Sequence, residues 1–105
     1  YHGFVLGLMV ELGDQYVLTS NRESGFGRYD VMLEPKRPGD IEIIIEFKVQ
    51  DGTEERELSE TVIAALRQID EKGYRTMLTV KGVPKEKIRT YGFAFCGKRV
   101  LIGRG

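Results

Sequence analysis

Residues 41–49, IEIIIEFKV, form a long run of strand-forming residues that carries two charges, Glu46 and Lys48, near its end. Successive side chains of a strand point to opposite faces, so these two charges project together while apolar side chains occupy the other face. A buried carboxylate and ammonium destabilise a sheet by roughly several kcal/mol unless they pair or bind a metal. The pattern predicts either a functional site or structural charge pairing. Glu42 on the same face favours a solvated face, whereas Ile44 favours a covered one.

The length and composition indicate one soluble globular domain. The chain has 105 residues, of which 41% are hydrophobic and 30% are charged, and its formal net charge is zero. A chain without a basic excess lacks a general attraction to nucleic acid, so any such contact has to be local. Basic residues gather in two stretches, for which solvation of the surface is the ordinary explanation. They are Lys81, Lys85, Lys87 and Arg89 in the first stretch, and Lys98, Arg99 and Arg104 in the second.

Single residues exclude or disfavour several classes of site. Cys96 is the only cysteine, which excludes an intramolecular disulfide and a cysteine-based zinc site, and its apolar surroundings predict a buried thiol. His2 is the only histidine, so a Ser-His-Asp or Cys-His site would need the very start of the chain. The sequence has neither a run of about eighteen apolar residues nor a signal peptide. We expect a cytoplasmic protein without a membrane segment, and because the sequence begins with Tyr1 we expect it to be part of a longer one.

The hydrophobic periodicity predicts an α/β protein of the α+β kind, with one mixed sheet of four to five strands flanked by helices. The predicted order is one helix, three strands, a second helix and two strands. The predicted helices cover residues 2–12 and 58–72, with Gly73 as the C-terminal cap, and the predicted strands cover residues 16–20, 28–33, 41–49, 88–95 and 99–102. Residues 74–80 are compatible with an extension of the helix or with a cover over the sheet.

Short turns join the first three strands, which favours consecutive antiparallel pairing and places Asp30 next to Glu46. Carboxylate oxygens are ligands that Mg²⁺ prefers, and the ion usually takes one or two of them together with waters and phosphate oxygens. Asp30, Glu46 and the backbone carbonyl of Phe47 could supply such a site, with Lys48 beside the metal-bound water. A water activated by a metal next to an ammonium group suits the hydrolysis of a phosphodiester.

Asp30 and Glu46-Phe47-Lys48, in this predicted order of elements, resemble the PD-(D/E)XK nuclease superfamily. The closer similarity is to the nuclease-like domain that follows an AAA-type ATPase-like domain in many bacterial proteins. It covers nearly the whole chain and is carried by the segments YHGFVLGLM, SNRESGFGRYDVML, IIIEFKV, ALRQID and YGFAFCGKRV. The resemblance implies a single domain over residues 1–105 with a restriction-endonuclease-like core. Tyr29 stands where the superfamily's motif has proline, a departure that many members share.

The resemblance also implies roles for individual residues. The two acidic residues would bind Mg²⁺ or Mn²⁺, Lys48 would be the catalytic lysine, and Gln68 would help to orient the site. Glu23 is either a further acidic contributor or part of a salt bridge that stabilises a turn. Arg28 either contacts a phosphate or pairs with Asp30.

We therefore expect a metal-dependent nuclease that hydrolyses nucleic-acid phosphodiester bonds, foremost in DNA, with an upstream ATPase-like domain as its partner in the longer protein. One alternative is a catalytically inactive nuclease-fold module that serves that ATPase as an interaction or nucleic-acid-binding platform. A second alternative is a metal-free structural domain in which the charges of the sheet only pair with one another. The sequence leaves open DNA versus RNA, endonuclease versus exonuclease, and the oligomeric state, including a homodimer.

Overall fold

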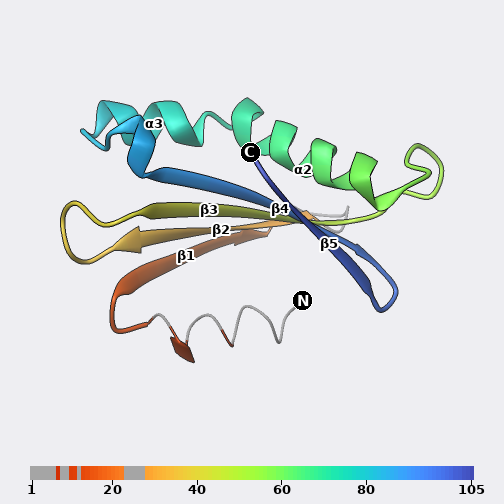
Figure 1. Cartoon of the computed structure of the whole chain (residues 1–105), viewed down its shortest axis with the longest axis horizontal. Coiled ribbons are helices and arrows are strands. Elements are labelled where there is room, and N and C mark those ends of the chain that lie inside the picture. The colour runs from red at the N-terminus through yellow and green to blue at the C-terminus, as the bar shows by residue number, and fades with distance from the viewer. Residues whose placement is uncertain (1–6, 8–9, 12, 23–27) are drawn as a thin grey trace.

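The computed structural model describes residues 7, 10–11, 13–22 and 28–105, with only the backbone described at residues 21, 22, 28 and 29. A twisted sheet lies under a layer of two helices (Figure 1). The strands are β1 (Tyr16–Arg22), β2 (Arg28–Pro35), β3 (Glu42–Val49), β4 (Ile88–Cys96) and β5 (Arg99–Arg104). The helices are α2 (Leu58–Glu71), α3 (Tyr74–Val80) and a 3₁₀ turn, Lys85–Lys87. The predicted helix over residues 2–12 lies mostly outside the described residues.

The sheet has the strand order β1-β2-β3-β4-β5. The pairs β1/β2, β2/β3 and β4/β5 are antiparallel, whereas β3 and β4 are parallel. A parallel pair needs a crossover connection, which α2 and α3 supply on one face of the sheet. The predicted α+β class, the mixed sheet and the order of its elements are confirmed, and they match a restriction-endonuclease-like core.

Successive side chains of β3 point alternately into two apolar cores, one on each face of the sheet. Phe47 lies on the face away from the helices, fully buried, with the rings of Phe93 and Phe95 at 5.2 and 6.0 Å from its own. Ile44 lies on the opposite face, fully buried against Ile69 of α2 and other apolar residues. Glu46 and Lys48 share the face of Ile44, so the two charges lie beneath the helical layer rather than in solvent.

Helix α2 packs on the sheet through one apolar stripe. Its buried residues include Leu58, Val62, Ala65 and Ile69, the spacing of one helical face. The helix ends where Gly73 adopts a left-handed conformation with φ of 70°, which a glycine tolerates better than any other residue. The predicted cap at Gly73 is therefore confirmed, and the chain restarts there as α3 instead of continuing α2.

Two glycines let α2 approach the sheet closely beside Glu46. Gly92 of β4 lies next to Glu46 of β3 in the parallel register, and Gly103 of β5 pairs with Gly92. A Cβ on Gly92 would lie 2.9 Å from the backbone carbonyl oxygen of Val62, and a Cβ on Gly103 would overlap the Val62 side chain. A larger residue at Gly92 would therefore push the helix from the sheet at the level of Glu46, and one at Gly103 would displace the Val62 side chain.

We expect Gly92→Ala to destabilise the protein by roughly 1–3 kcal/mol, the usual effect of overpacking a core. The nearest atom to the added methyl group is a backbone carbonyl oxygen of α2, which cannot rotate away as a side chain can. Urea denaturation of the two proteins measures the difference in the free energy of unfolding. Gly52→Ala is the matched control, because nothing lies within 4 Å of a Cβ at that turn position. Equal losses in both variants would contradict this account of Gly92.

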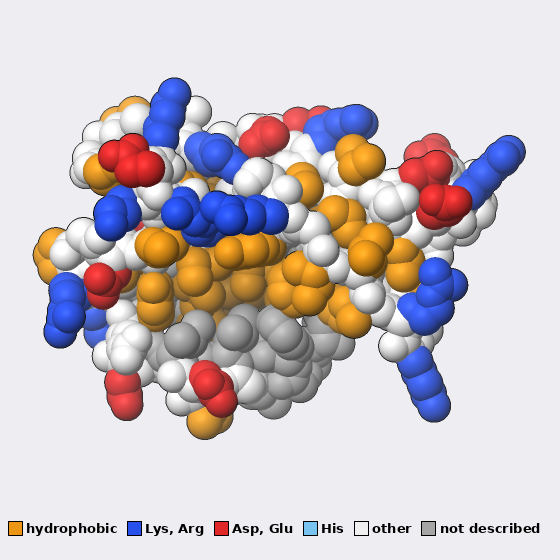
Figure 2. Space-filling view, in the orientation of Figure 1, with side chains coloured by type: hydrophobic (Ala, Val, Ile, Leu, Met, Phe, Trp, Pro, Cys, Tyr) orange, Lys and Arg blue, Asp and Glu red, His pale blue; other side chains and the backbone are white. Residues whose placement is uncertain are grey.

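Strand β5 forms one border of the described sheet and exposes apolar side chains on both of its faces. Val100, Leu101 and Ile102 are each more than 40% exposed. Figure 2 shows hydrophobic side chains gathered across the middle of the viewed side, with a row of Lys and Arg side chains along their upper edge and others at the right. The strand begins and ends with arginine, at Arg99 and Arg104.

Candidate active site

Asp30 and Glu46 lie directly opposite each other on the antiparallel strands β2 and β3. Both side chains point to the face covered by the helices, and they are 3% and 0% exposed. Directly opposed residues of an antiparallel pair have Cα atoms about 4.5–5.5 Å apart, so the two carboxylates are close neighbours. The predicted juxtaposition of these two residues is confirmed. The group that balances their negative charges was not predicted from the sequence.

A lysine and a tyrosine that follow α2 contact these carboxylates. The Nζ atom of Lys72 lies 2.6 Å from Oδ2 of Asp30 and 3.1 Å from Oε1 of Glu46, so one ammonium bridges both acidic residues. The hydroxyl of Tyr74 donates to the same Oδ2 of Asp30 at 3.0 Å. A cation between two buried carboxylates is the arrangement that their mutual repulsion requires.

Lys48 lies on the same face as Glu46 but forms an ion pair with Glu55, in the loop before α2. Its Nζ lies 2.8 Å from both carboxylate oxygens of Glu55, and both residues are buried. The Glu55 carboxylate also accepts hydrogen bonds from the hydroxyl of Thr61 at 3.0 Å and from the backbone N–H of Asp51 at 2.8 Å. Glu55 therefore fixes the position of the lysine predicted to be catalytic.

Two opposing effects act on the pKa of Glu55. Burial raises it, while the hydrogen bonds from Lys48, the Asp51 N–H and Thr61, together with the charge of Lys48, lower it. The lowering effects prevail, so the pKa of Glu55 lies below its ordinary value of 4.5. A carboxylate whose pKa is lowered in the folded state stabilises the fold above its unfolded pKa, and this contribution is lost as the pH falls through the folded value.

Glu55→Gln should therefore lower the free energy of unfolding at neutral pH by about 3 kcal/mol, because it leaves Lys48 buried without its counter-charge. The difference from the wild type should be constant above the ordinary pKa of 4.5 and shrink as the pH falls below it. Urea denaturation between pH 3 and pH 8 measures both quantities. Glu54→Gln, at an exposed neighbouring position, is the control and should show neither effect. A difference that does not depend on pH would contradict the ionic explanation.

The remaining predicted site residues differ in how much the structure says about them. Gln68 is half-buried on α2, one turn before Lys72, and its backbone carbonyl accepts the N–H of Lys72. The Phe47 side chain points to the opposite core, so that only its backbone is available to the site. Arg28 pairs with Lys48 in the strand register, but its side chain and all of Glu23 lie outside the described part of the chain.

Sequence reasoning missed Lys72, Tyr74 and Glu55. Glu55 belongs to the polar segment QDGTEERE, where a charged residue is usually solvated, and nothing local distinguishes it from Glu54. Lys72 occupies the end of a helix, where a lysine is common because it complements the helix dipole. Its contacts are with residues 26 and 42 positions earlier in the sequence. Lys72 and Tyr74 follow the predicted site residue Gln68 by four and six positions. This closeness in the sequence was the only local indication that they belong to the site.

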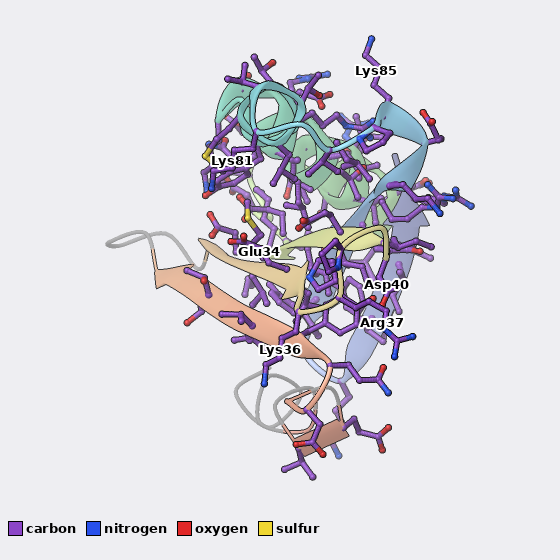
Figure 3. All side chains as sticks on the ribbon, turned by 90° about the vertical axis from the view of Figure 1, so that its left-hand side faces the viewer. Glu34, Lys36, Arg37, Asp40, Lys81 and Lys85 are labelled. Atoms are coloured by element: carbon purple, nitrogen blue, oxygen red, sulfur yellow. The ribbon has the colours of Figure 1, made fainter. Side chains whose placement is uncertain are left out.

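A second pair of carboxylates lies on the same face, at the end of the sheet near the β2–β3 turn. Glu42 is 8% exposed, and its Oε2 has no hydrogen-bond partner within the described ranges. Burial and the nearby charge of Glu34 raise the pKa of Glu42, while the charge of Lys81 opposes them. Figure 3 shows Lys81 on the helical layer above the strand that carries Glu34. This pair is less well compensated than Asp30 and Glu46, because no ammonium is bonded to it in the described structure.

Glu42→Gln should consequently stabilise the protein at neutral pH by about 1 kcal/mol, since it removes a buried charge that lacks a full partner. A carboxyl group whose pKa is raised in the folded state favours folding at low pH, and this advantage is lost as the pH rises. The gain in the variant should thus vanish below about pH 4.5, the ordinary value for Glu42. Thermal unfolding across the pH range tests this, and Lys81→Met should shift stability in the opposite direction. A loss of stability in Glu42→Gln at pH 7 would contradict the assignment.

The donor set at Asp30 and Glu46 fits a divalent cation. The two carboxylates already converge on one positive group, the Lys72 ammonium, which stands in for a cation at this position. Mg²⁺ is commonly held by one or two carboxylates, with water and phosphate oxygens as its other ligands. No cluster of three or more His, Cys, Asp or Glu side chains suited to a metal occurs among the described residues, so a cage built wholly of protein ligands is not formed there.

Comparison with known proteins gives one result. A sequence model of the PD-(D/E)XK nuclease superfamily matches residues 1–105. The chain belongs to the PD-(D/E)XK nuclease superfamily. Members of this superfamily are generally nucleases and typically use divalent metal ions, which agrees with the pair of carboxylates at Asp30 and Glu46. No curated protein and no solved structure gives a match.

Membership in the PD-(D/E)XK superfamily agrees with the position of the site in the fold. The acidic residue of β2 and the Glu-x-Lys sequence of β3 are brought together by the β2–β3 pairing, and α2 packs on β3. Among the described residues, the helices are too short or too polar to cross a membrane.

Proposed function

We propose that this protein is a metal-dependent nuclease that hydrolyses DNA phosphodiester bonds, with Asp30 and Glu46 as ligands of Mg²⁺ or Mn²⁺. The observation that carries the proposal is the convergence of two buried carboxylates from neighbouring strands on one cation. The superfamily supplies the class of reaction, and the bridging ammonium supports the location of the metal. A divalent cation bound here would supply a water of lowered pKa and positive charge beside a phosphate oxygen.

Lys48 is proposed to contact the phosphate or its attacking water. An ammonium has three N–H donors, and the two oxygens of Glu55 take up at most two of them in the described structure. The ion pair with Glu55 holds the charge of Lys48 in place, so that no reorganisation is needed when negative charge develops on the phosphate. Glu55 is in this scheme a positioning residue, and Gln68 is proposed to orient the groups around the carboxylates.

The noncatalytic alternative has one observation in its favour. Lys72 balances Asp30 and Glu46, and Glu55 balances Lys48, so the fold compensates these charges without a metal. A nuclease-fold module that serves as a platform for an upstream ATPase-like domain would need nothing more. Two acidic ligands and a fixed lysine on one buried face are the minimum set for hydrolysis, however, and pairing alone would tolerate many other arrangements. We therefore place catalysis first.

Purified protein should cleave plasmid and linear DNA in the presence of Mn²⁺ or Mg²⁺ and should lose this activity with EDTA. Asp30→Asn and Glu46→Gln should remove it, and Lys48→Met should lower kcat by about 10²-fold or more, the usual effect of losing a group that stabilises the transition state. Glu54→Gln, which removes an exposed carboxylate outside the site, is the matched control. Gel electrophoresis of labelled DNA measures the rates, and RNA of the same sequence tests the choice of substrate. Absence of metal-dependent cleavage, or equal rates in wild type and Glu46→Gln, would disprove the proposal.

A further inference from the structure

We propose that Lys72 is a built-in occupant of the cation position, and that a divalent metal ion binds only by displacing its ammonium group. Lys72 would then set the affinity of the site for metal. This inference rests on the proposed function, since it takes Asp30 and Glu46 as the metal ligands. It goes further because it assigns to a residue outside the Asp and Glu-x-Lys motif the control of metal binding.

The first argument concerns charge. Asp30 and Glu46 are almost fully buried and lie opposite each other, so two negative charges share a space from which water is excluded. Two carboxylates this close repel each other, and a cation between them offsets the repulsion. The Lys72 Nζ provides this cation at 2.6 and 3.1 Å, in contact with an oxygen of each carboxylate. A metal ion bound by both carboxylates needs the same place, so the two cations exclude each other.

The second argument concerns the difference between the two lysines of the site. Lys48 is buried, and its partner Glu55 is held in turn by Thr61 and by the Asp51 N–H, so moving Lys48 would break a connected network. Lys72 is partly exposed at the C-terminal end of α2, directly before the left-handed Gly73. A lysine side chain has a flexible four-carbon stem, and from this edge its ammonium can move to water. Lys48 is thus the fixed cation of the site, and Lys72 is the exchangeable one.

Tyr74 holds Asp30 in place during the proposed exchange of Lys72 for a metal ion. Its hydroxyl donates to Oδ2 of Asp30, the same oxygen that Lys72 contacts. When the ammonium leaves, this hydrogen bond remains and holds Asp30 in its orientation. We assign Tyr74 as a positioning residue for the ligand, and the exchange of Lys72 for a metal leaves the strand pairing of Asp30 and Glu46 unchanged.

Isothermal titration calorimetry with MnCl₂ tests the inference directly, without any measurement of cleavage. Lys72→Met keeps most of the length of the unbranched side chain and removes its charge, so it should bind Mn²⁺ about tenfold or more tightly than the wild type, within the usual range of coupled equilibria. Lys72→Gln serves as a second neutral variant should the methionine variant fold poorly. Lys72→Arg keeps a competing cation and should bind no more tightly than the wild type. Lys98→Met, in the exposed turn between β4 and β5, controls for the loss of one positive charge.

Thermal unfolding gives a second readout. Without metal, Lys72→Met should unfold at a lower temperature than the wild type, because Asp30 and Glu46 lose their bridging cation. Saturating Mn²⁺ should raise the unfolding temperature of the variant more than that of the wild type, so that the difference between them narrows. Lys98→Met should follow the wild type in both conditions.

The outcomes separate the two proposals. If wild type and neutral Lys72 variants bind Mn²⁺ equally, or the variants bind more weakly, Lys72 does not compete with metal, and the inference is wrong while the metal site stands. If neither protein binds Mn²⁺, the metal site itself is absent, and both the inference and the proposed function fail. Asp30→Asn completes the test, since it should abolish binding in the wild type and in Lys72→Met alike.

Discussion

The burial of two opposed carboxylates on neighbouring strands is the constraint on which the other features of this protein depend. Asp30 and Glu46 have almost no access to water, and their charges repel each other more strongly in the interior than they would at the surface. Positive charge brought from elsewhere in the chain offsets this repulsion. The end of α2 supplies this charge, and the crossover connection therefore both joins two parallel strands and completes the electrostatics of the site.

Close packing of α2 keeps that site free of solvent. Gly92 and Gly103 create a shallow place in the sheet next to Glu46, and Val62 fills it. Because the helix lies low there, every group beneath it interacts in a medium of low dielectric constant, in which each ion pair and hydrogen bond has a greater effect. The close packing at these two glycines, which have no functional side chain, thus strengthens the interactions made by the charged groups of the site.

The sequence predicted the fold well because its signals are local and repetitive. Alternation in residues 41–49 and helical spacing in residues 58–72 each define a buried face, and both were found within one or two residues of their observed limits. The neighbouring positions of Asp30 and Glu46 followed from short turns between antiparallel strands.

The parts of the site that were missed come from contacts between distant residues. Lys72 and Glu55 are charged residues in settings where most charged residues are solvated. Nothing in their neighbours shows that they turn inward. The bridging of Asp30 by a residue 42 positions later depends on where α2 ends above the sheet, which is a property of the packed structure rather than of any segment. For the same reason, the partner of Lys48 could not be inferred from the Glu-x-Lys sequence alone.

The arginines at the two ends of β5 bear on the solubility of the protein. An exposed border strand with apolar side chains is a template on which further chains can add, and this is a common origin of aggregation. If two copies of β5 paired antiparallel about a twofold axis, Arg99 of each would face Arg104 of the other, and the like charges would oppose the association. In such a pairing Arg99 and Arg104 would act as gatekeepers against fibre growth, at the two ends of β5, where a charge does not interrupt its apolar centre.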